Sequence, residues 1–222
     1  MTFTPQQVVD AWQNMQPWVE RQLSDLARHT ELSDDERKNA GDIRVCQTLD
    51  RGGRGSLRWS SDGDASYTLS SQQITALDKV TIKTATTMDE STAHLPFGFS
   101  LLEVKGKYIY DQPCAAWDLG KKVTASHAGG QGAVIQAIDD NTLSYVVNTG
   151  DAITLESVVI GGTIRVNLIP DSGGMPPWIA SLLSFMTPGS QLEGFRSKLQ
   201  DAFQQGSFTK TMLTLLEHEI RG

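Results

Sequence analysis

The segment from Gly120 to Pro170 constrains the fold of this chain more than any other part of the sequence. Its β-branched and apolar residues alternate with polar ones in five short runs, and Gly, Asp and Asn stand between the runs. Alternation with a period of two predicts strands, and turn residues between them predict hairpins. We therefore expect an antiparallel meander or small barrel, with strands at 121–127, 132–138, 142–148, 152–160 and 163–169.

The β pattern begins earlier, near residue 42. Phe97–Val104 and Tyr108–Tyr110 alternate in the same way, and Lys105-Gly106-Lys107 between them predicts a tight hairpin. Short strands are also expected around Trp59 and Tyr67, while the run Arg51-Gly-Gly-Arg-Gly55 predicts a turn. Between Ser71 and Asp78 the sequence fits a helical turn as well as a strand, and the prediction stays open. Residues 42–170 are thus expected to form a β-rich body.

Helical patterns stand on both sides of this body. Thr4 and Gln7 form a capping box with Pro5 at the first helical position, and apolar residues follow at helical spacing to a kink or restart at Pro17. A second capping box at 33–36 predicts a short helix that ends near Gly41. We expect an N-terminal helical arm over 1–41.

The last fifty residues return to helical spacing. Helices are expected from Pro176, from a capping box at 190–193, and from Ser207, which is expected to cap the last one. Residues 171–222 should form a C-terminal helical cap, so the fold class is α+β. The apolar stripes of these helices are expected to bury against the sheet or against another subunit.

Composition argues against several functions. The net charge is −7 and the pI is about 5.0, whereas a nucleic-acid-binding surface concentrates Lys and Arg. No apolar segment approaches the length of a spanning helix, and the N-terminus lacks the pattern of a secretion leader. Cys46 and Cys114 are too few for a disulfide framework, so reduced thiols and a cytoplasmic location are expected.

Cofactor and metal sites are not expected either. The glycine runs at 129–132 and 161–162 are not followed by a helix whose N-terminus would hold a phosphate. The four histidines are scattered, with no pair at helical ligand spacing. Asp139-Asp140-Asn141 offers oxygens but lacks the rest of a calcium loop, and a hairpin turn explains it better.

One stretch of the meander resembles the KOW segment of SH3-like barrels. Val123, Gly130, Gly132 and the run from Val134 to Asp139 carry the resemblance, which covers fewer than thirty residues. Any tight hairpin would select these glycines and valines, so no function is carried over from the resemblance. An acidic adaptor whose small SH3-like barrel binds a peptide or nucleic acid is considered beside it. This adaptor is one alternative function.

A second stretch resembles the nucleophile loop of trypsin-like serine proteases. Ser172 lies in Asp171-Ser-Gly-Gly174, and Thr92-Ala93-His94 resembles the segment that carries the family's histidine. Pro170, however, stands where that family has a glycine whose N–H helps to form the oxyanion hole, and proline has no N–H. A turn between sheet and helices explains the stretch more simply.

A cysteine nucleophile is the remaining catalytic alternative. Cys114 with His94 or His127 would form a thiolate pair, although a lone cysteine in such a setting is more often a small buried apolar residue. A hydrolase that uses Ser172 or Cys114 is therefore kept as the other alternative function.

The expected function is a non-catalytic structural or protein-binding component of a larger complex, such as a bacteriophage virion, without cofactor, metal or membrane. Large aromatic residues on the terminal helices support this, because aromatic anchors are common at interfaces. Protein partners or self-association are expected. The interface candidates are Trp12, Trp18, Trp178, Phe185, Phe195, Phe203 and Phe208.

Overall fold

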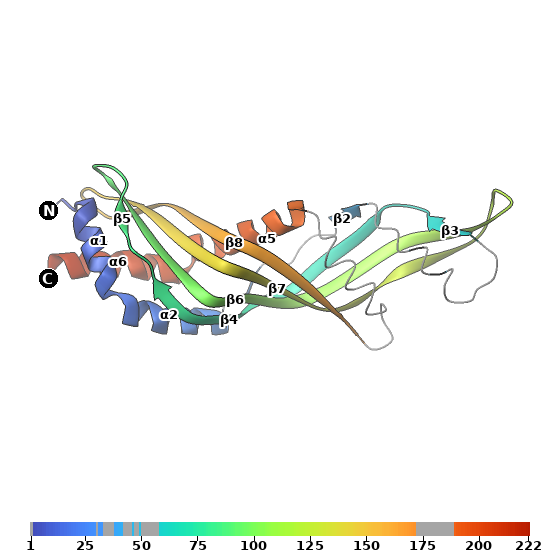
Figure 1. Cartoon of the computed structure of the whole chain (residues 1–222), viewed down its shortest axis with the longest axis horizontal. Helices are drawn as coiled ribbons and strands as arrows, with labels where there is room; N and C mark the ends of the chain where they lie inside the picture. Colours follow the sequence, from blue (N-terminus) through green and yellow to red (C-terminus); the bar gives the residue numbers. More distant parts are fainter. Residues whose placement is uncertain are drawn as a thin grey trace.

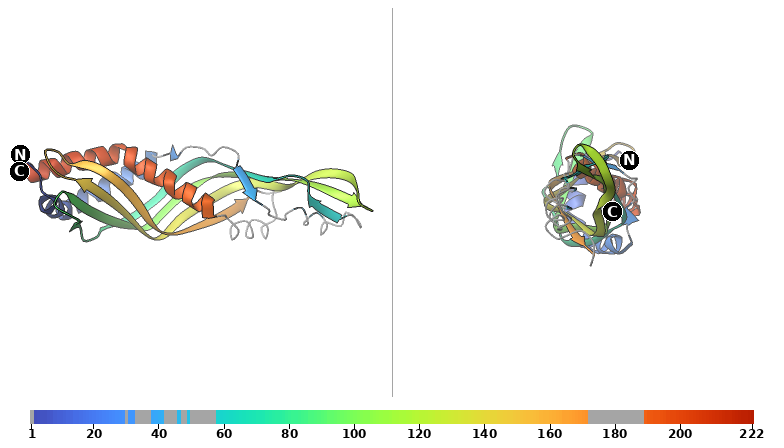
Figure 2. Two further views of the ribbon diagram at one scale, coloured as in Figure 1. Left: turned by 90° about the horizontal axis from the view of Figure 1, so that it is seen from above. Right: turned by 90° about the vertical axis from the view of Figure 1, so that its right-hand side faces the viewer.

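The computed structural model describes residues 2–29, 31–32, 38–41, 46, 49, 58–171 and 189–222. The molecule is a long rod, with both termini and the helices at one end and a bare β-hairpin at the other (Figures 1 and 2). In this described part, eight strands form one antiparallel sheet with a main path of β1-β4-β6-β7-β8. The α+β class is confirmed, but the sheet is not closed into a barrel.

The strands at the centre of the sheet are much longer than expected. The sheet is built from β1 (Glu31–Leu32), β2 (Lys38–Gly41), β3 (Arg58–Ser61), β4 (Ala65–Ile82), β5 (Thr86–Thr87), β6 (Thr92–Asp118), β7 (Lys121–Asn148) and β8 (Thr154–Pro170). The stretch around residues 71–78, open between helix and strand, is strand in β4. The turn between β7 and β8 lies where the sequence predicted it, after Asn148.

Several predicted hairpins are wrong, because the chain runs straight through them. Gly106 lies inside β6, the Gly129–Gly132 run and Asp139-Asp140-Asn141 lie inside β7, and Gly161-Gly162 lies inside β8. The predicted helix that ends near Gly41 is also wrong over Lys38–Gly41, which forms β2. A meander of short strands is thus replaced by three very long ones.

Close backbone contact explains the glycines within these strands. A Cβ atom on Gly129 would lie 2.2 Å from the carbonyl oxygen of Tyr110, and one on Gly132 would lie 2.1 Å from that of Ile169. Both distances are far inside van der Waals contact, so only glycine fits there without a shift of the backbone. These glycines allow neighbouring strands to approach and do not reverse the chain.

The run Asp139-Asp140-Asn141 forms a bulge in β7. Asp140 has φ +50°, and the register with β8 shifts between Asp139 and Thr142. The buried Asn141 side chain accepts a hydrogen bond from the Phe99 N–H at 2.8 Å and donates to the Phe99 carbonyl at 3.0 Å. The amide of Asn141 thereby satisfies the backbone groups that the bulge leaves without a strand partner.

Replacing Asn141 with alanine is expected to lower the free energy of unfolding by about 2–3 kcal/mol, because the buried Phe99 N–H and carbonyl then lose their partner. Urea denaturation followed by circular dichroism measures the change. Asn167→Ala, on the exposed face of β8, is the matched control and should shift the free energy by less than about 0.5 kcal/mol. Equal effects of the two substitutions would contradict this account of the bulge.

The N-terminal helices follow the local signals in the sequence. Thr4 caps α1 (Pro5–Asn14) in the predicted capping box with Gln7. The chain restarts at α2 (Gln16–His29), so Pro17 lies in a first turn, where its missing N–H costs nothing. Both helices pack against the sheet, α1 on β6 and α2 on β4.

The C-terminal helices are α5 (Gly189–Gln205) and α6 (Ser207–Arg221). The predicted cap by Ser207 is wrong, since the N-cap residue is Gly206 and it makes no side-chain cap. Helix α5 packs along β8, and α6 packs against α1, α2 and α5. The apolar stripes of the described helices are therefore buried against this chain's own sheet and against one another.

Phe97 lies at the centre of the core between helices and sheet. It is fully buried, and its ring contacts the rings of Trp12, Phe99, Tyr145 and Phe208 at centroid distances from 5.5 to 6.4 Å. Nearby, the Thr209 hydroxyl donates to the Phe203 carbonyl and lies 3.1 Å from the Tyr145 hydroxyl oxygen. One apolar cluster thus joins all four of the described helices to the part of the sheet that they cover.

Several sequence predictions lie outside the described residues. These are the capping box at 33–36, the turn at 51–55, the helix from Pro176, and the residues Ser172, Trp178 and Phe185.

Candidate functional site

The half of the sheet that the helices do not cover has its own apolar core, separate from the core under the helices. We call it the distal half and define it as residues 58–70, 105–134 and 166–171. In β6, side chains alternate from Lys107 to Gln112: Tyr108, Tyr110 and Gln112 are buried, whereas Lys107 and Ile109 are exposed. The distal half therefore has one covered inner face and one solvent-exposed outer face.

The inner face is rich in tyrosine. Tyr67, Tyr108 and Tyr110 cluster with Trp59 and Val134, and this cluster is separate from the core under the helices. The hydroxyls of Tyr108 and Tyr110 are buried and make no hydrogen bond within the described part of the chain. A buried hydroxyl without a partner lowers the free energy of unfolding by about 1–3 kcal/mol relative to a hydrogen-bonded one. Two such hydroxyls side by side are therefore an unusual feature of this core.

Burial changes the ionisation of these phenols. Loss of solvation raises the pKa of Tyr110 to about 12, with a smaller contribution from the nearby Asp111 carboxylate. The pKa of Tyr108 is raised as well, by burial first and by Asp171 second. A phenolate is therefore disfavoured on the inner face, and both phenols keep their protons at neutral pH.

An alkaline titration tests this environment. We expect a step in tyrosinate absorbance with a midpoint near pH 12, which Tyr110→Phe removes. Because the folded pKa lies above the unfolded value of about 10, stability from this group is present below pH 10 and is lost as pH rises toward 12. Titration of Tyr110 near pH 10 in the folded protein would show that the phenol is solvated.

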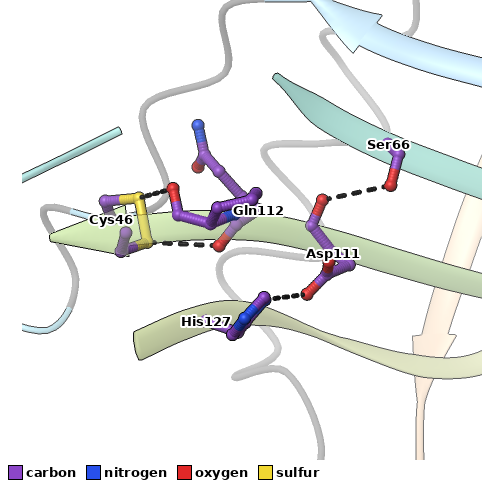
Figure 3. Close-up of polar contacts among 7 residues, drawn as sticks. Cys46, Ser66, Asp111, Gln112 and His127 are labelled. Carbon is purple, nitrogen blue, oxygen red and sulfur yellow. Dashed lines mark hydrogen bonds and ion pairs between the residues drawn. A yellow bond between two sulfur atoms is a disulfide. The ribbon is translucent and has the colours of Figure 1, made fainter. Parts of the chain in front are cut away.

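A disulfide between Cys46 and Cys114 closes one end of the inner face (Figure 3). Both residues are buried, and 68 positions separate them in the sequence. The expectation of reduced thiols is wrong, and so is Cys114 as a nucleophile, because a sulfur in a disulfide carries no thiolate. The pairing also argues against the expected cytoplasmic location, since such bonds persist mainly in oxidising compartments.

The side chains of His127 and Asp111 are in contact on the outer face. His127 Nδ1 lies 2.9 Å from an Asp111 carboxylate oxygen, and the side chain of His127 is about two-thirds exposed. The Ser66 hydroxyl reaches the backbone carbonyl of Asp111 and not the imidazole (Figure 3). The three residues are therefore not connected as nucleophile, base and orienting acid.

His94 and His127, the histidines of the predicted hydrolase sites, lie in different parts of the sheet, and neither is placed to act on Cys114. His94 pairs with Thr86 and Val146, in the half of the sheet that carries the helices. His127 is opposite Pro113 and Cys114 is opposite Ser126, so His127 and Cys114 point to opposite faces of the sheet. In the described part of the chain no three His, Cys, Asp or Glu side chains are grouped to hold a metal ion.

The hairpin at the end of the distal half carries a leucine in an unusual conformation. Leu119 and Gly120 connect β6 to β7 with φ values of +45° and +79°, the signs of a type I′ turn. Asn, Asp or Gly is favoured at such a position, and the leucine side chain is 98% exposed. An apolar residue thus stands at the tip of the rod, where neither folding nor solubility favours it.

Exposed apolar residues concentrate around this tip and on the outer face. Ile109 is 53% exposed, and Ile169 lies near it across β7, since Ile109 pairs with Gln131 and Ile169 with Ala133. Of the six large apolar residues that are exposed in the described chain, four belong to the distal half: Ile109, Leu119, Val123 and Ile169.

The structure places four of the described interface candidates inside the molecule and leaves Trp18 partly exposed. Trp12, Phe195, Phe203 and Phe208 are buried in the core under the helices, and Trp18 stacks on Phe208 at 5.7 Å. These residues therefore have a packing role in this chain, and a contact with a partner stays a prediction. The periodicity of the sequence did not predict the exposed apolar residues of the distal half. The one local sign of them was Leu119, an apolar residue directly before Gly120.

In the described chain no helix is both long and apolar enough to cross a bilayer. No family model matches the sequence, and no curated protein matches it. Among solved structures, the crystal structure of a lipopolysaccharide binding protein is similar at a TM-score of 0.49 and 16% identity. The match covers 92% of this chain but only 39% of that one, and we take no inference about function from a similarity of this size.

Proposed function

We propose that this chain is a non-catalytic binding protein that contacts a protein partner through the outer face and tip of its distal half. The observation that carries the proposal is the concentration of exposed apolar side chains there, with Ile109 and Ile169 on one face and Leu119 at the end of the rod. Exposed apolar residues gathered on one part of a surface are typical of interaction sites.

The helical end supports this division of roles. Its large aromatic residues are buried within the chain, so they stabilise the rod and present little apolar surface to a partner. The outer face also carries Lys105 and Lys107, which are exposed on either side of Gly106. A partner surface that is apolar at its centre and acidic at its edge fits this arrangement.

The disulfide favours action in an oxidising compartment, which replaces the cytoplasmic location expected from the sequence. Membership of a larger complex agrees with a binding role. No described residue supports the narrower prediction of a virion component, which stays a prediction. The hydrolase alternative now depends on Ser172 alone, because Cys114 is held in the disulfide.

Site-specific photo-crosslinking in the native cells tests the proposal. A benzoylphenylalanine at position 109 is expected to give one discrete protein adduct, and Ile169→Asp should abolish it. The same probe at position 88, where Met88 is 60% exposed at the helical end, is the matched control and should give no such adduct. Equal labelling from both positions would contradict the proposal, as would fluorophosphonate labelling that Ser172→Ala removes.

A further inference from the structure

A polar band crosses the middle of the sheet on its inner face. Gln72 of β4 and Gln136 of β7 are both buried, and the side-chain amide of Gln136 donates to the side-chain oxygen of Gln72 at 3.0 Å. Strand β6 lies between these two strands and has Gly106 at this level, where a Cβ atom would lie 2.9 Å from the Gln72 side chain. The missing side chain of Gly106 thus lets Gln72 reach across β6 to Gln136.

The band separates the two apolar cores of the rod. Val104 belongs to the core under the helices, whereas Tyr108, four positions further along β6, belongs to the tyrosine cluster of the distal half. Two amides bonded to each other add no apolar contact between these cores. Strand β4 also bulges here, since Ser71 has φ +51° and the register with β6 shifts between Ser70 and Gln73. Packing therefore couples the two halves weakly, and one half can open without the other.

The disulfide belongs to the distal half alone. Cys46 and Cys114 are both members of the tyrosine cluster, and Leu49 packs against it. Cys46 and Leu49 lie outside the long strands, so the bond ties another part of the chain to β6. Because the bond joins residues 68 positions apart, its loop entropy favours the closed arrangement by about a thousandfold. The chain has no other cysteines, so the helical end has no such bond.

The inner face of the distal half also contains groups that favour opening. The hydroxyls of Tyr108 and Tyr110 are buried without a hydrogen-bond partner in the described part of the chain. In an open arrangement water would bond to both hydroxyls, so the closed arrangement is less stable than a core whose hydroxyls are paired. The distal half thus combines incompletely satisfied packing with a covalent bond that favours closure.

We propose that the disulfide is a redox switch for the distal half. While the bond is intact the inner face is closed, and reduction by a dithiol opens that face and leaves the helical end folded. One thiolate of the dithiol attacks a sulfur of the bond and releases the other cysteine, and its second thiolate then releases the first. Two electrons pass from the dithiol, which becomes a disulfide, and its two protons end on Cys46 and Cys114.

Burial of the bond sets the order of these events. Cys46 and Cys114 are at most 1% exposed in the closed form, so a dithiol reaches the sulfurs only during a transient opening of the distal half. Reduction then removes the restraint that favoured closure, and the open arrangement persists. The switch is therefore slow to act and stays open until the two thiols are oxidised again.

The tyrosines of the chain report on the two halves separately. Tyr108 and Tyr110 belong to the distal cluster, whereas Tyr145 is fully buried in the core under the helices. The full chain is reduced with dithiothreitol, alkylated, freed of reagent and nitrated with tetranitromethane, and the nitrated residues are identified by mass spectrometry. Compared with the oxidised chain, we expect nitration of Tyr108 and Tyr110 to be faster by about two to three orders of magnitude and that of Tyr145 to be unchanged.

The variant Cys46→Ala/Cys114→Ala is the matched control, because it lacks both the bond and the alkyl groups. It should show the pattern of the reduced chain without any reductant, and dithiothreitol should not change that pattern. Far-UV circular dichroism of both forms should keep the helical signal.

Three results would overturn the proposal. Fast nitration of Tyr108 and Tyr110 before reduction would show that the face is open with the bond intact, and no gain after reduction would show that packing alone closes it. Nitration of Tyr145 at the same rate would show that the whole rod unfolds. The proposal does not depend on the proposed function, because Ile109 lies on the outer face and its adduct is measured separately from nitration.

Discussion

Replacing Phe97 with alanine is expected to lower the free energy of unfolding by about 3–5 kcal/mol. The ring is fully buried and contacts four other aromatic rings, which come from α1, β6, β7 and α6. Its removal leaves a cavity where helices and sheet meet, and the long β6 and β7 strands limit how far the core can collapse into it. Urea denaturation followed by circular dichroism and by tryptophan fluorescence measures the change.

Ile109→Ala is the matched control for this substitution. Ile109 lies on the same strand, also loses an apolar side chain, and is more than half exposed. We expect a change of less than about 1 kcal/mol, because little buried surface is lost. If Phe97→Ala and Ile109→Ala cost the same, the junction of helices and sheet would not be the main core.

Removing the disulfide is expected to have an effect of similar size at the other end of the rod. A bond that joins residues 68 positions apart restricts the unfolded chain by about 4 kcal/mol of loop entropy at 25 °C. The double variant Cys46→Ala/Cys114→Ala should therefore unfold at a distinctly lower urea concentration than the oxidised protein. The reduced wild type should behave like the variant.

Thiol titration of the denatured protein checks the bond itself. We expect no reactive thiol before reduction and both of the chain's two cysteines after it. As a control, reducing agent should leave the stability of the double-alanine variant unchanged. Two thiols in the protein purified under oxidising conditions would contradict the pairing and would restore the expectation of a reduced chain.

Local signals predicted the ends of some elements well. The capping box at Thr4 and the restart near Pro17 depend on residues within one helical turn, and both are present in the structure. The alternation over 121–170 also predicted strand correctly, because the period of two is a property of each strand by itself. The candidate site was not predicted, since exposure of Ile109 or Leu119 depends on what covers each face.

Turns were the main error, and the reason is physical. A glycine allows a chain to reverse, and it equally allows a neighbouring strand to come close. Gly129 and Gly132 serve the second purpose, because the carbonyls of Tyr110 and Ile169 lie where their side chains would be. At Asp139-Asp140-Asn141 the turn-forming residues make a bulge that Asn141 bonds to Phe99. The sequence does not say which strand lies beside them.

The amino-acid sequence by itself determined the α+β class, the positions of α1 and α2, and the strand character of the long middle segment, because these depend on contacts within a few residues. The tertiary structure decided the length of β6, β7 and β8, the pairing of Cys46 with Cys114 and the register of β7 between β6 and β8. These features depend on pairs of groups far apart in the sequence, and only the folded chain brings such groups together.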